Sequence, residues 1–166
     1  MAKNITVELS DKSISQAIKE VKRYKKWVTQ KTEELRSRLA MIGATAASIR
    51  FAGAIYNGTN DVSVRVEDDG MMATIYAEGN AVCFIEFGSG MKYGYGHPEA
   101  DKFGFGPGTW SDNEELGGKH HWKNEKGWYF GSGQHSYGNP PAQAMLTARN
   151  EIAENVARIA REVFAN

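Results

Sequence analysis

A run of apolar residues at helical spacing constrains this fold most, because it requires one very long helix. The positions recur at steps of three and four, and they are Ile14, Ala17, Ile18, Val21, Tyr24, Val28, Leu35, Leu39, Ile42, Ala46 and Ile49. That period predicts an amphipathic helix of about forty residues, about 55–60 Å long at 1.5 Å per residue. A helix of that length extends beyond an ordinary small core, so we expect part of the stripe to pack on another copy of the chain.

The start of this helix and two weak positions within it refine the prediction. Ser13 and Gln16 stand at the spacing of a capping box, in which each side chain satisfies a backbone N–H of the first turn. We expect the helix to occupy residues 10–51. Thr32 interrupts the stripe and Gly43 weakens it, so a bend or break near either residue would agree with the sequence.

Alternating apolar residues after the helix predict a β meander. Residues 62–66 alternate valine with polar side chains, the turn sequence Asp68-Asp69-Gly70 follows, and residues 71–77 return. Residues 82–87 are apolar on both faces apart from one glutamate, so we expect the most buried strand there. The alternation in residues 4–9 predicts a short fourth strand.

The last segment predicts a second amphipathic helix over residues 140–165. Asn139 is a suitable N-cap, and Pro141 suits the first helical position, where no N–H is needed. The apolar stripe of this helix consists of Met145, Ala148, Ile152, Val156, Ile159 and Val163.

Together these elements predict one α+β domain over residues 1–166. An antiparallel β meander of three or four strands, in residues 61–88, packs on the long N-terminal helix and on the C-terminal helix. Residues 88–139 form a long loop insertion rich in glycine and aromatic residues.

This insertion is distinctive in composition. The stretch from Phe87 to Pro141 holds thirteen of the eighteen glycines. A connection of this length is normally either functional or disordered, and disordered chain is poor in aromatic residues. We therefore expect an ordered loop that packs on its own domain or on a neighbouring subunit.

Charge is balanced overall but unevenly distributed along the chain. Residues 11–50 carry ten Lys or Arg against four Asp or Glu, whereas residues 61–116 carry three against eleven. This polarity fits copies that stack head to tail, or it reflects only a solvated basic helix face.

No apolar run is long enough for a membrane span, and the N-terminus lacks the apolar core of a signal peptide, so we expect a soluble protein made in a cytoplasm.

Metal and enzyme chemistry find little support in the sequence. His97, His120, His121 and His135 lack the ligand spacing of a structural zinc site, and the single Cys83 lies in a predicted strand. No nucleophile elbow, phosphate loop or zinc-protease motif occurs. We expect no cofactor, no metal and no enzyme activity.

One alternative of another class stays open. Glu86 and later carboxylates, together with Trp110, Trp122 and Trp128, would suit a cell-wall protein that binds or hydrolyses carbohydrate, although nothing fixes the spacing of a carboxylate pair. Glu86 is better explained as the partner of an arginine or of backbone N–H groups at a strand end.

Three short motifs in a fixed order resemble a known family. They are Ile85-Glu86-Phe87-Gly88-Ser89-Gly90, the element Gly127-Trp128-Tyr129-Phe130-Gly131, and Gly138-Asn139-Pro140-Pro141 at the entry to the last helix. With the basic N-terminal helix they resemble the HK97 gp10-like family of tailed-phage neck, head–tail connector and tail-completion proteins. The resemblance covers roughly residues 10–166, and residues 91–126 look like an elaboration without an assigned role.

The resemblance implies a structural virion protein of a tailed phage, a prophage or a phage-tail-like particle. Such a protein would form a ring, hexameric by the symmetry of tails, at the head–tail junction or at the head-proximal end of the tail. Its partners would be its own copies, head-closure or connector proteins, and tail-tube or terminator proteins. DNA would pass through the lumen without specific binding, and no membrane would be involved.

The residues expected to carry these roles fall into three groups. Those expected to contact an adjacent subunit or ring are Phe103, Phe105, Trp110, Trp122, Trp128 and Tyr129. The expected sheet core is Val82, Phe84, Ile85 and Phe87, with Glu86 and Gly88 fixing the strand end. The candidate charged assembly face is Lys19, Lys22, Arg23, Lys25 and Lys26.

Overall fold

The computed structural model describes residues 10–90, 93, 96–103, 126–129 and 135–165. The elements in chain order are α1 (Asp11–Ala52), β1 (Ser63–Asp68), β2 (Ala73–Glu78), α2 (Val82–Phe87), the 3₁₀ helix η1 (Ala100–Phe103), β3 (Trp128–Tyr129), β4 (His135–Ser136) and α3 (Ala144–Ala165).

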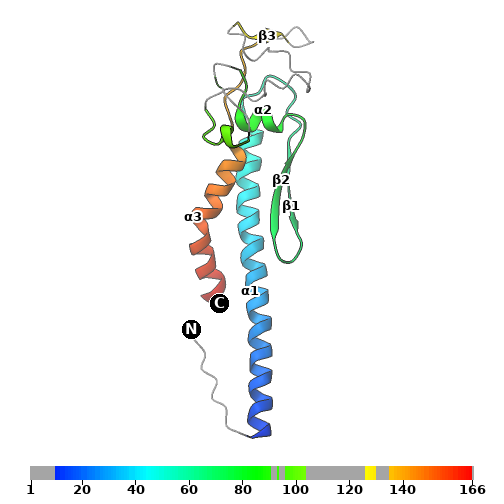
Figure 1. The fold of residues 1–166 in the computed structure, drawn as a ribbon, viewed down its shortest axis with the longest axis vertical. Helices are drawn as coiled ribbons and strands as arrows, with labels where there is room; N and C mark the ends of the chain where they lie inside the picture. The colour runs from blue at the N-terminus through cyan, green and yellow to red at the C-terminus, as the bar shows by residue number, and fades with distance from the viewer. Residues whose placement is uncertain (1–9, 91–92, 94–95, 104–125, 130–134, 166) are drawn as a thin grey trace.

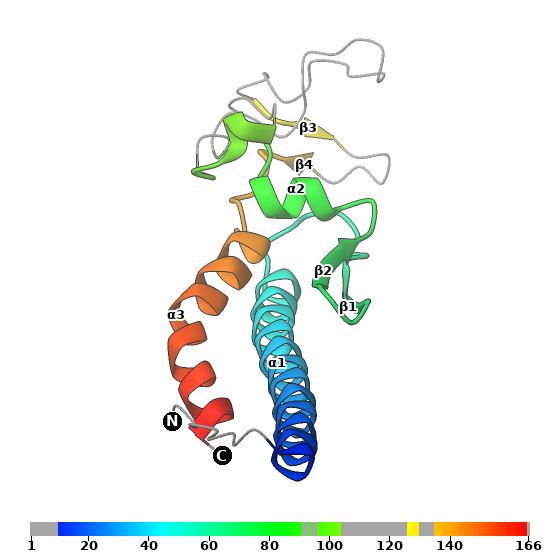
Figure 2. The ribbon, with the colours of Figure 1, turned by 60° about the horizontal axis from the view of Figure 1, so that its bottom comes forward.

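Helix α1 is the axis of an elongated molecule. Figures 1 and 2 show α3 beside the C-terminal half of α1, and the β1–β2 hairpin along another flank. Helix α2 and the β3–β4 pair lie across the C-terminal end of α1. This mixture of helix and antiparallel sheet confirms the α+β class, whereas the only sheets among the described residues have two strands each.

The N-cap of helix α1 lies three residues before the predicted one. Ser10 is the N-cap, and its hydroxyl accepts a hydrogen bond from the Ser13 N–H at 3.3 Å. The predicted box of Ser13 and Gln16 is therefore wrong. The helix runs through 42 residues without interruption, so neither Thr32 nor Gly43 breaks it.

The fully buried positions of α1 lie next to the predicted apolar stripe, whose middle is half-buried and whose two ends are exposed. Small residues line the buried face, which lets α3 and the hairpin approach closely: a Cβ on Gly43 would lie 2.6 Å from a methyl carbon of both Ile152 and Ile75. Stripe residues Ile18 and Ile49 instead keep 50% and 66% of their surface exposed. The stripe lies beside the intramolecular core, whose α1 members are Ala40, Gly43, Ala47 and Phe51.

The predicted hairpin is confirmed. Val64 pairs with Ala77 and Val66 with Ile75 across the antiparallel strands. The side chain of Asp69 accepts hydrogen bonds from backbone N–H groups in the tight turn. At the same end of the hairpin, the Arg36 guanidinium of α1 donates to both carboxylate oxygens of Asp68, at 3.0 and 2.8 Å. This pair holds the tip of the hairpin against α1.

Helix α2 occupies the segment predicted to be the most buried strand. Its short apolar run has no period that distinguishes strand from buried helix. Asp61 accepts hydrogen bonds from the N–H groups of Asn80 and Ala81, at 2.8 and 2.9 Å, immediately before the helix. These bonds satisfy backbone donors that would otherwise be left open where a helix starts.

The predicted sheet core is therefore wrong in its secondary structure. Of the four residues concerned, only Ile85 is fully buried, in a cluster with Phe51 and Ala148. The other three, Val82, Phe84 and Phe87, are half-buried. The expected strand end is the C-terminal end of α2, where Gly88 has a φ of 80°.

Helix α3 begins at Ala144, later than predicted. Asn139 is not its N-cap, because Asn139 pairs with Ser89 in a backbone bridge and its side chain donates to the Phe84 carbonyl at 2.8 Å. Pro141 lies ahead of the helix. The predicted apolar stripe is confirmed at three positions that are buried: Ala148, Ile159 and Val163.

Parts of the predicted fold lie outside the described residues. These are the strand over residues 4–9 and much of the insertion, including residues 104–125. No helix in the described part of the chain combines the length and apolarity that a membrane crossing requires.

Candidate functional site

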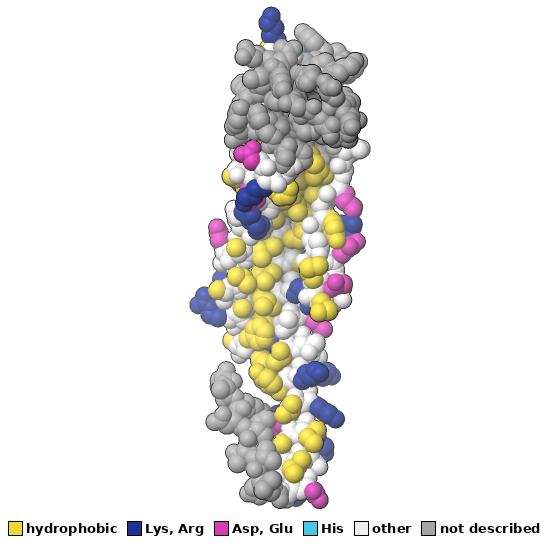
Figure 3. Space-filling view, in the orientation of Figure 1, with side chains coloured by type: hydrophobic (Ala, Val, Ile, Leu, Met, Phe, Trp, Pro, Cys, Tyr) yellow, Lys and Arg dark blue, Asp and Glu magenta, His cyan; other side chains and the backbone are white. Residues whose placement is uncertain are grey.

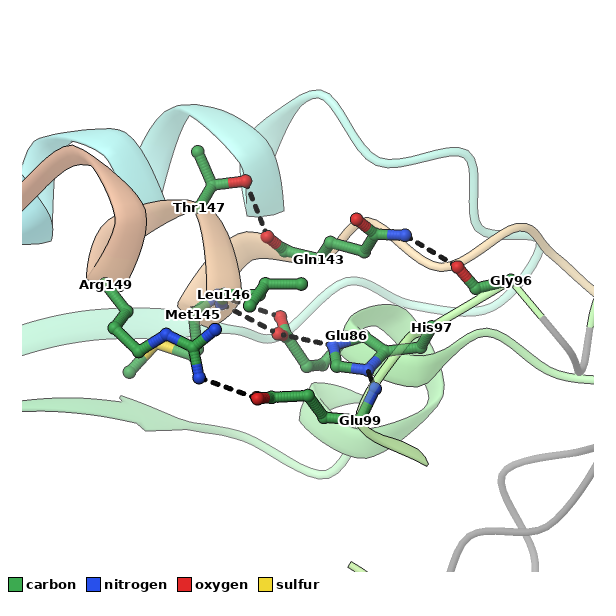
Figure 4. A network of polar contacts seen from close by, with 9 residues as sticks. All are labelled: Glu86, Gly96, His97, Glu99, Gln143, Met145, Leu146, Thr147 and Arg149. Carbon is green, nitrogen blue, oxygen red and sulfur yellow. Dashed lines mark hydrogen bonds and ion pairs between the residues drawn. The ribbon is translucent and has the colours of Figure 1, made fainter. Parts of the chain in front are cut away.

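A buried carboxylate joins α2 to the start of α3. Glu86 has 4% of its surface exposed. Its Oε2 accepts a hydrogen bond from the Met145 N–H at 3.0 Å, and its Oε1 accepts one from the Leu146 N–H at 3.2 Å (Figure 4). The first N–H groups of a helix lack partners within the helix and favour a negative charge. Glu86 therefore caps α3 from a distant part of the chain. Its partners are backbone N–H groups, as one of the two predicted alternatives had it, but they lie at the start of a helix and not at a strand end.

His97 completes this buried contact. Its Nε2 lies 3.3 Å from Glu86 Oε1, and its Nδ1 accepts a hydrogen bond from the Glu99 N–H at 3.1 Å. Since Nδ1 is an acceptor, the arrangement assigns the ring proton to Nε2, which then donates to Glu86. The imidazole also packs on the Phe87 ring, with centroids 4.5 Å apart.

Two further contacts attach the segment around His97 to α3. Arg149 of α3 donates to Glu99 Oε1 at 2.7 Å, and Lys102 donates to the same oxygen at 3.0 Å. The Gln143 side chain donates to the Gly96 carbonyl at 2.7 Å (Figure 4). Hydrogen bonding to Arg149 and then to Lys102 lowers the pKa of Glu99 from 4.5 to about 2.

Substitution of Glu99 should therefore reduce stability at neutral pH more than in acid. A carboxyl group whose pKa is depressed by folding stabilises the protein fully above its unfolded-state pKa, here 4.5, and that contribution is lost as the pH falls toward about 2. We expect the difference in urea midpoint between wild type and Glu99→Gln to be small, because the partners Arg149 and Lys102 are solvent-exposed, and to vanish across this window. Glu154→Gln, on an exposed part of α3, is the control. A difference that does not change with pH would contradict this account.

A backbone clamp lies next to the Glu86 contact. The Ser89 N–H donates to the Asn139 carbonyl at 2.9 Å, and the Asn139 N–H donates back to Ser89 O at 3.1 Å. Gly138 beside it has a φ of 98°, and a Cβ there would overlap the Ser89 carbonyl. We call the Ser89–Asn139 pair the clamp. It brings two of the three sequence motifs together.

The geometry of this junction suits structure better than catalysis. Both oxygens of Glu86 and both ring nitrogens of His97 have hydrogen-bonding partners within the chain, and both residues are buried. A general base needs reach to a substrate proton, and neither side chain offers it. Among the described residues no group of three or more His, Cys, Asp or Glu is arranged to hold a metal ion.

The predicted contact residues are only partly placed. Phe103 is exposed at the end of η1, with its ring 5.4 Å from that of Phe87. Trp128 and Tyr129 form β3, whose backbone pairs with β4. The other three, Phe105, Trp110 and Trp122, lie outside the described residues.

The predicted basic face is exposed in the N-terminal part of α1. Trp27 packs edge-on against Phe164, near the end of α3, with centroids 5.8 Å apart. Residues 11–26 continue beyond this contact (Figure 1), and we call them the overhang. Its side chains include the five predicted basic residues Lys19, Lys22, Arg23, Lys25 and Lys26, and the exposed apolar residues Ile14, Ile18, Val21 and Tyr24.

A groove between α1 and α3 continues the apolar surface. Met41, Ile42 and Ile49 of α1 and Ile159 of α3 line it. Charged residues at its rim are Arg38, Arg50, Glu151 and Arg158. Figure 3 shows hydrophobic side chains exposed along this face, from the level of the hairpin to the lower end of α1.

The sequence alone did not identify the partners of Glu86 or the contacts that hold the segment around His97 on α3. His97, Gln143 and Arg149 act through contacts across the insertion, for which no local pattern exists. Met71 and Met72 directly follow the predicted turn, and they are 91% and 61% exposed, as expected of residues beside a turn.

Comparisons of the chain with family models, with curated proteins and with solved structures found no match.

Proposed function

We propose that this chain is a structural, non-enzymatic protein of a tailed phage, a prophage or a phage-tail-like particle. In this proposal copies form a ring, expected to be hexameric, at the head–tail junction or at the head-proximal end of the tail. The ring would contact connector or head-closure proteins on one side and tail-tube or terminator proteins on the other. DNA would pass through it without specific binding.

The observation that carries the proposal is the N-terminal part of the apolar stripe of α1, which the fold of the chain leaves exposed, whereas the middle of the stripe is half-buried. The overhang exposes an apolar ridge formed by Ile14, Ile18, Val21 and Tyr24. Contact of apolar surface with water is unfavourable, and contiguous exposed apolar surface of this kind marks interaction sites. Small residues on the adjacent face of α1 already supply the contact with α3. This part of the stripe is therefore available for another polypeptide.

The arrangement of the motifs that resemble the phage family also supports the proposal. The clamp joins the first motif to the third, and Gly127 of the second motif has a φ of 73°, with the Ser136 carbonyl where a Cβ would stand. Glu86 of the first motif caps α3 just after the third. These residues serve the frame of the molecule, as expected of a structural protein.

Assembly of the purified protein tests the proposal. We expect wild type to form rings visible by negative-stain microscopy, alone or with the proteins encoded beside it, and Trp128→Ala to impair ring formation while circular dichroism stays unchanged. Ile55→Ala, at an exposed position after α1, is the matched control. Binding to peptidoglycan in a pull-down, or clearing of a peptidoglycan suspension, would instead favour a cell-wall carbohydrate protein.

A further inference from the structure

We propose that the overhang of one copy binds the β1–β2 hairpin of a second copy. The overhang is residues 11–26 of α1, and its acceptor is the tip and the solvent-facing side of the hairpin. This inference rests on the proposed function in one respect, namely that copies of the chain associate. Beyond that, the inference names the two surfaces, and because they differ, each copy uses one surface to bind one neighbour and the other surface to bind another neighbour.

Charge on the two surfaces is opposite. The overhang has six Lys or Arg against two Asp or Glu, and residues 61–78 of the hairpin have five Asp or Glu against one Arg. Among the described residues, Arg23 of the overhang pairs only with its helical neighbour Glu20. Complementary charges of this kind steer association and fix the register of an interface.

Both surfaces also expose apolar side chains. The overhang presents one ridge at helical spacing, formed by Ile14, Ile18, Val21 and Tyr24. The hairpin presents Met71, Met72 and Tyr76. An amphipathic helix anchored at such spacing is a common mode of docking, and flexible methionines adapt well to a docked surface.

The acceptor hairpin cannot belong to the same copy. Asp68 holds the tip of the hairpin against Arg36, ten residues after the end of the overhang at Lys26. Ten residues of helix separate the two surfaces by about 15 Å along one rigid axis. Because α1 is continuous, the overhang cannot turn back onto its own hairpin.

The hairpin also suits the overhang better than the α1–α3 groove does. The rim of the groove carries Arg38, Arg50 and Arg158 against Glu151, and Glu162 beside it is paired with Arg38 and Arg158, so the rim offers a basic helix few acidic partners. Figure 3 shows Lys and Arg side chains flanking the hydrophobic ones at the lower end of α1, and Asp and Glu side chains on the flank of the hairpin. Pairing two different surfaces gives a heterologous contact, which closes into a ring or extends as a filament.

A charge swap tests this contact. Lys22→Glu with Lys25→Glu makes the overhang acidic, and Glu67→Lys with Glu78→Lys makes the hairpin basic. These two glutamates are half-exposed, at 59% and 52% of their side chains, and pair with Arg65 on the solvent-facing side. We expect each double variant alone to self-associate at least about tenfold more weakly than wild type at low salt, and an equal mixture of the two to recover association. Sedimentation velocity over a wide concentration range measures both.

The controls separate this inference from the proposed function. Arg50→Glu with Arg161→Glu reverses two exposed charges elsewhere and should leave association unchanged. Rings that still form from both double variants would overturn the inference and leave the proposed function standing. A successful charge swap that yields only dimers or filaments would support the inference and contradict the ring. A wild type that stays monomeric throughout, or an overhang variant that loses only DNA binding, would overturn the inference.

Discussion

Gly138→Ala is expected to lower the free energy of unfolding by about 3 kcal/mol or more. Alanine at a φ of 98° costs about 1–2 kcal/mol, because its Cβ crowds the backbone. The same Cβ would overlap the Ser89 carbonyl, so the clamp would have to open. Each of its two backbone hydrogen bonds contributes about 1 kcal/mol. Urea unfolding followed by circular dichroism measures the loss.

Gly70→Ala is the matched control for this variant. Gly70 has a φ of 89°, but nothing lies within 4 Å of a Cβ built there. Its substitution should cost only the backbone term, about 1–2 kcal/mol. Equal losses for Gly70→Ala and Gly138→Ala would show that the clamp contributes nothing to stability.

Glu86→Ala is expected to cost about 3 kcal/mol or more, because it leaves three N–H donors without their acceptor and each such buried donor costs about 1–3 kcal/mol. The substitution takes away both hydrogen bonds to the start of α3, and His97 stays buried without its acceptor. The helix that loses its cap also carries Phe164, which packs on Trp27. We therefore expect tryptophan fluorescence to report a loosened α3 before global unfolding.

Two variants bracket the role of Glu86. Glu86→Gln keeps the shape and one acceptor oxygen, so it should cost less than Glu86→Ala. Glu154→Ala removes an exposed carboxylate of α3 and should change stability by less than about 0.5 kcal/mol. If Glu86→Ala were as mild as Glu154→Ala, the capping role of Glu86 would be refuted.

The elements that the sequence predicted correctly are those specified by neighbouring residues. The two long helices follow from apolar residues at steps of three and four, and the hairpin follows from Asp68-Asp69-Gly70 between alternating strands. Their bounds were less well predicted. The start of α3 moved to Ala144, because the segment before it pairs with Ser89 instead of entering the helix.

The predictions that failed depended on contacts distant in the chain. Helix α2 has the composition of a strand, but Asp61 accepts from N–H groups before it and Glu86 reaches α3 from it. The core face of α1 was assigned to the larger apolar side chains, yet close packing selected the face with Gly43 and Ala47. A helix carrying two apolar faces does not reveal from sequence which one its own chain will cover.

The candidate site was predicted in part for the same reason. The basic residues of the overhang form a helical pattern, and the structure places them on an exposed end. The lone charge of Glu86 in an apolar run predicted a partner that is either an arginine or backbone N–H groups at a strand end, and the partners are N–H groups at the start of α3. Its contact with His97 was not predicted, because eleven residues separate them without any regular period.

The clamp has a consequence for how this chain can diversify. Ser89 and Asn139 meet although fifty positions separate them, and the segment between them also contacts the frame through His97 and Glu99. Doubling the length of a loop between fixed ends costs only about 0.6 kcal/mol in closure entropy. A change in chain length after η1 would leave the clamp and the contacts of His97 and Glu99 in place, so the scaffold can accept such a change at little cost.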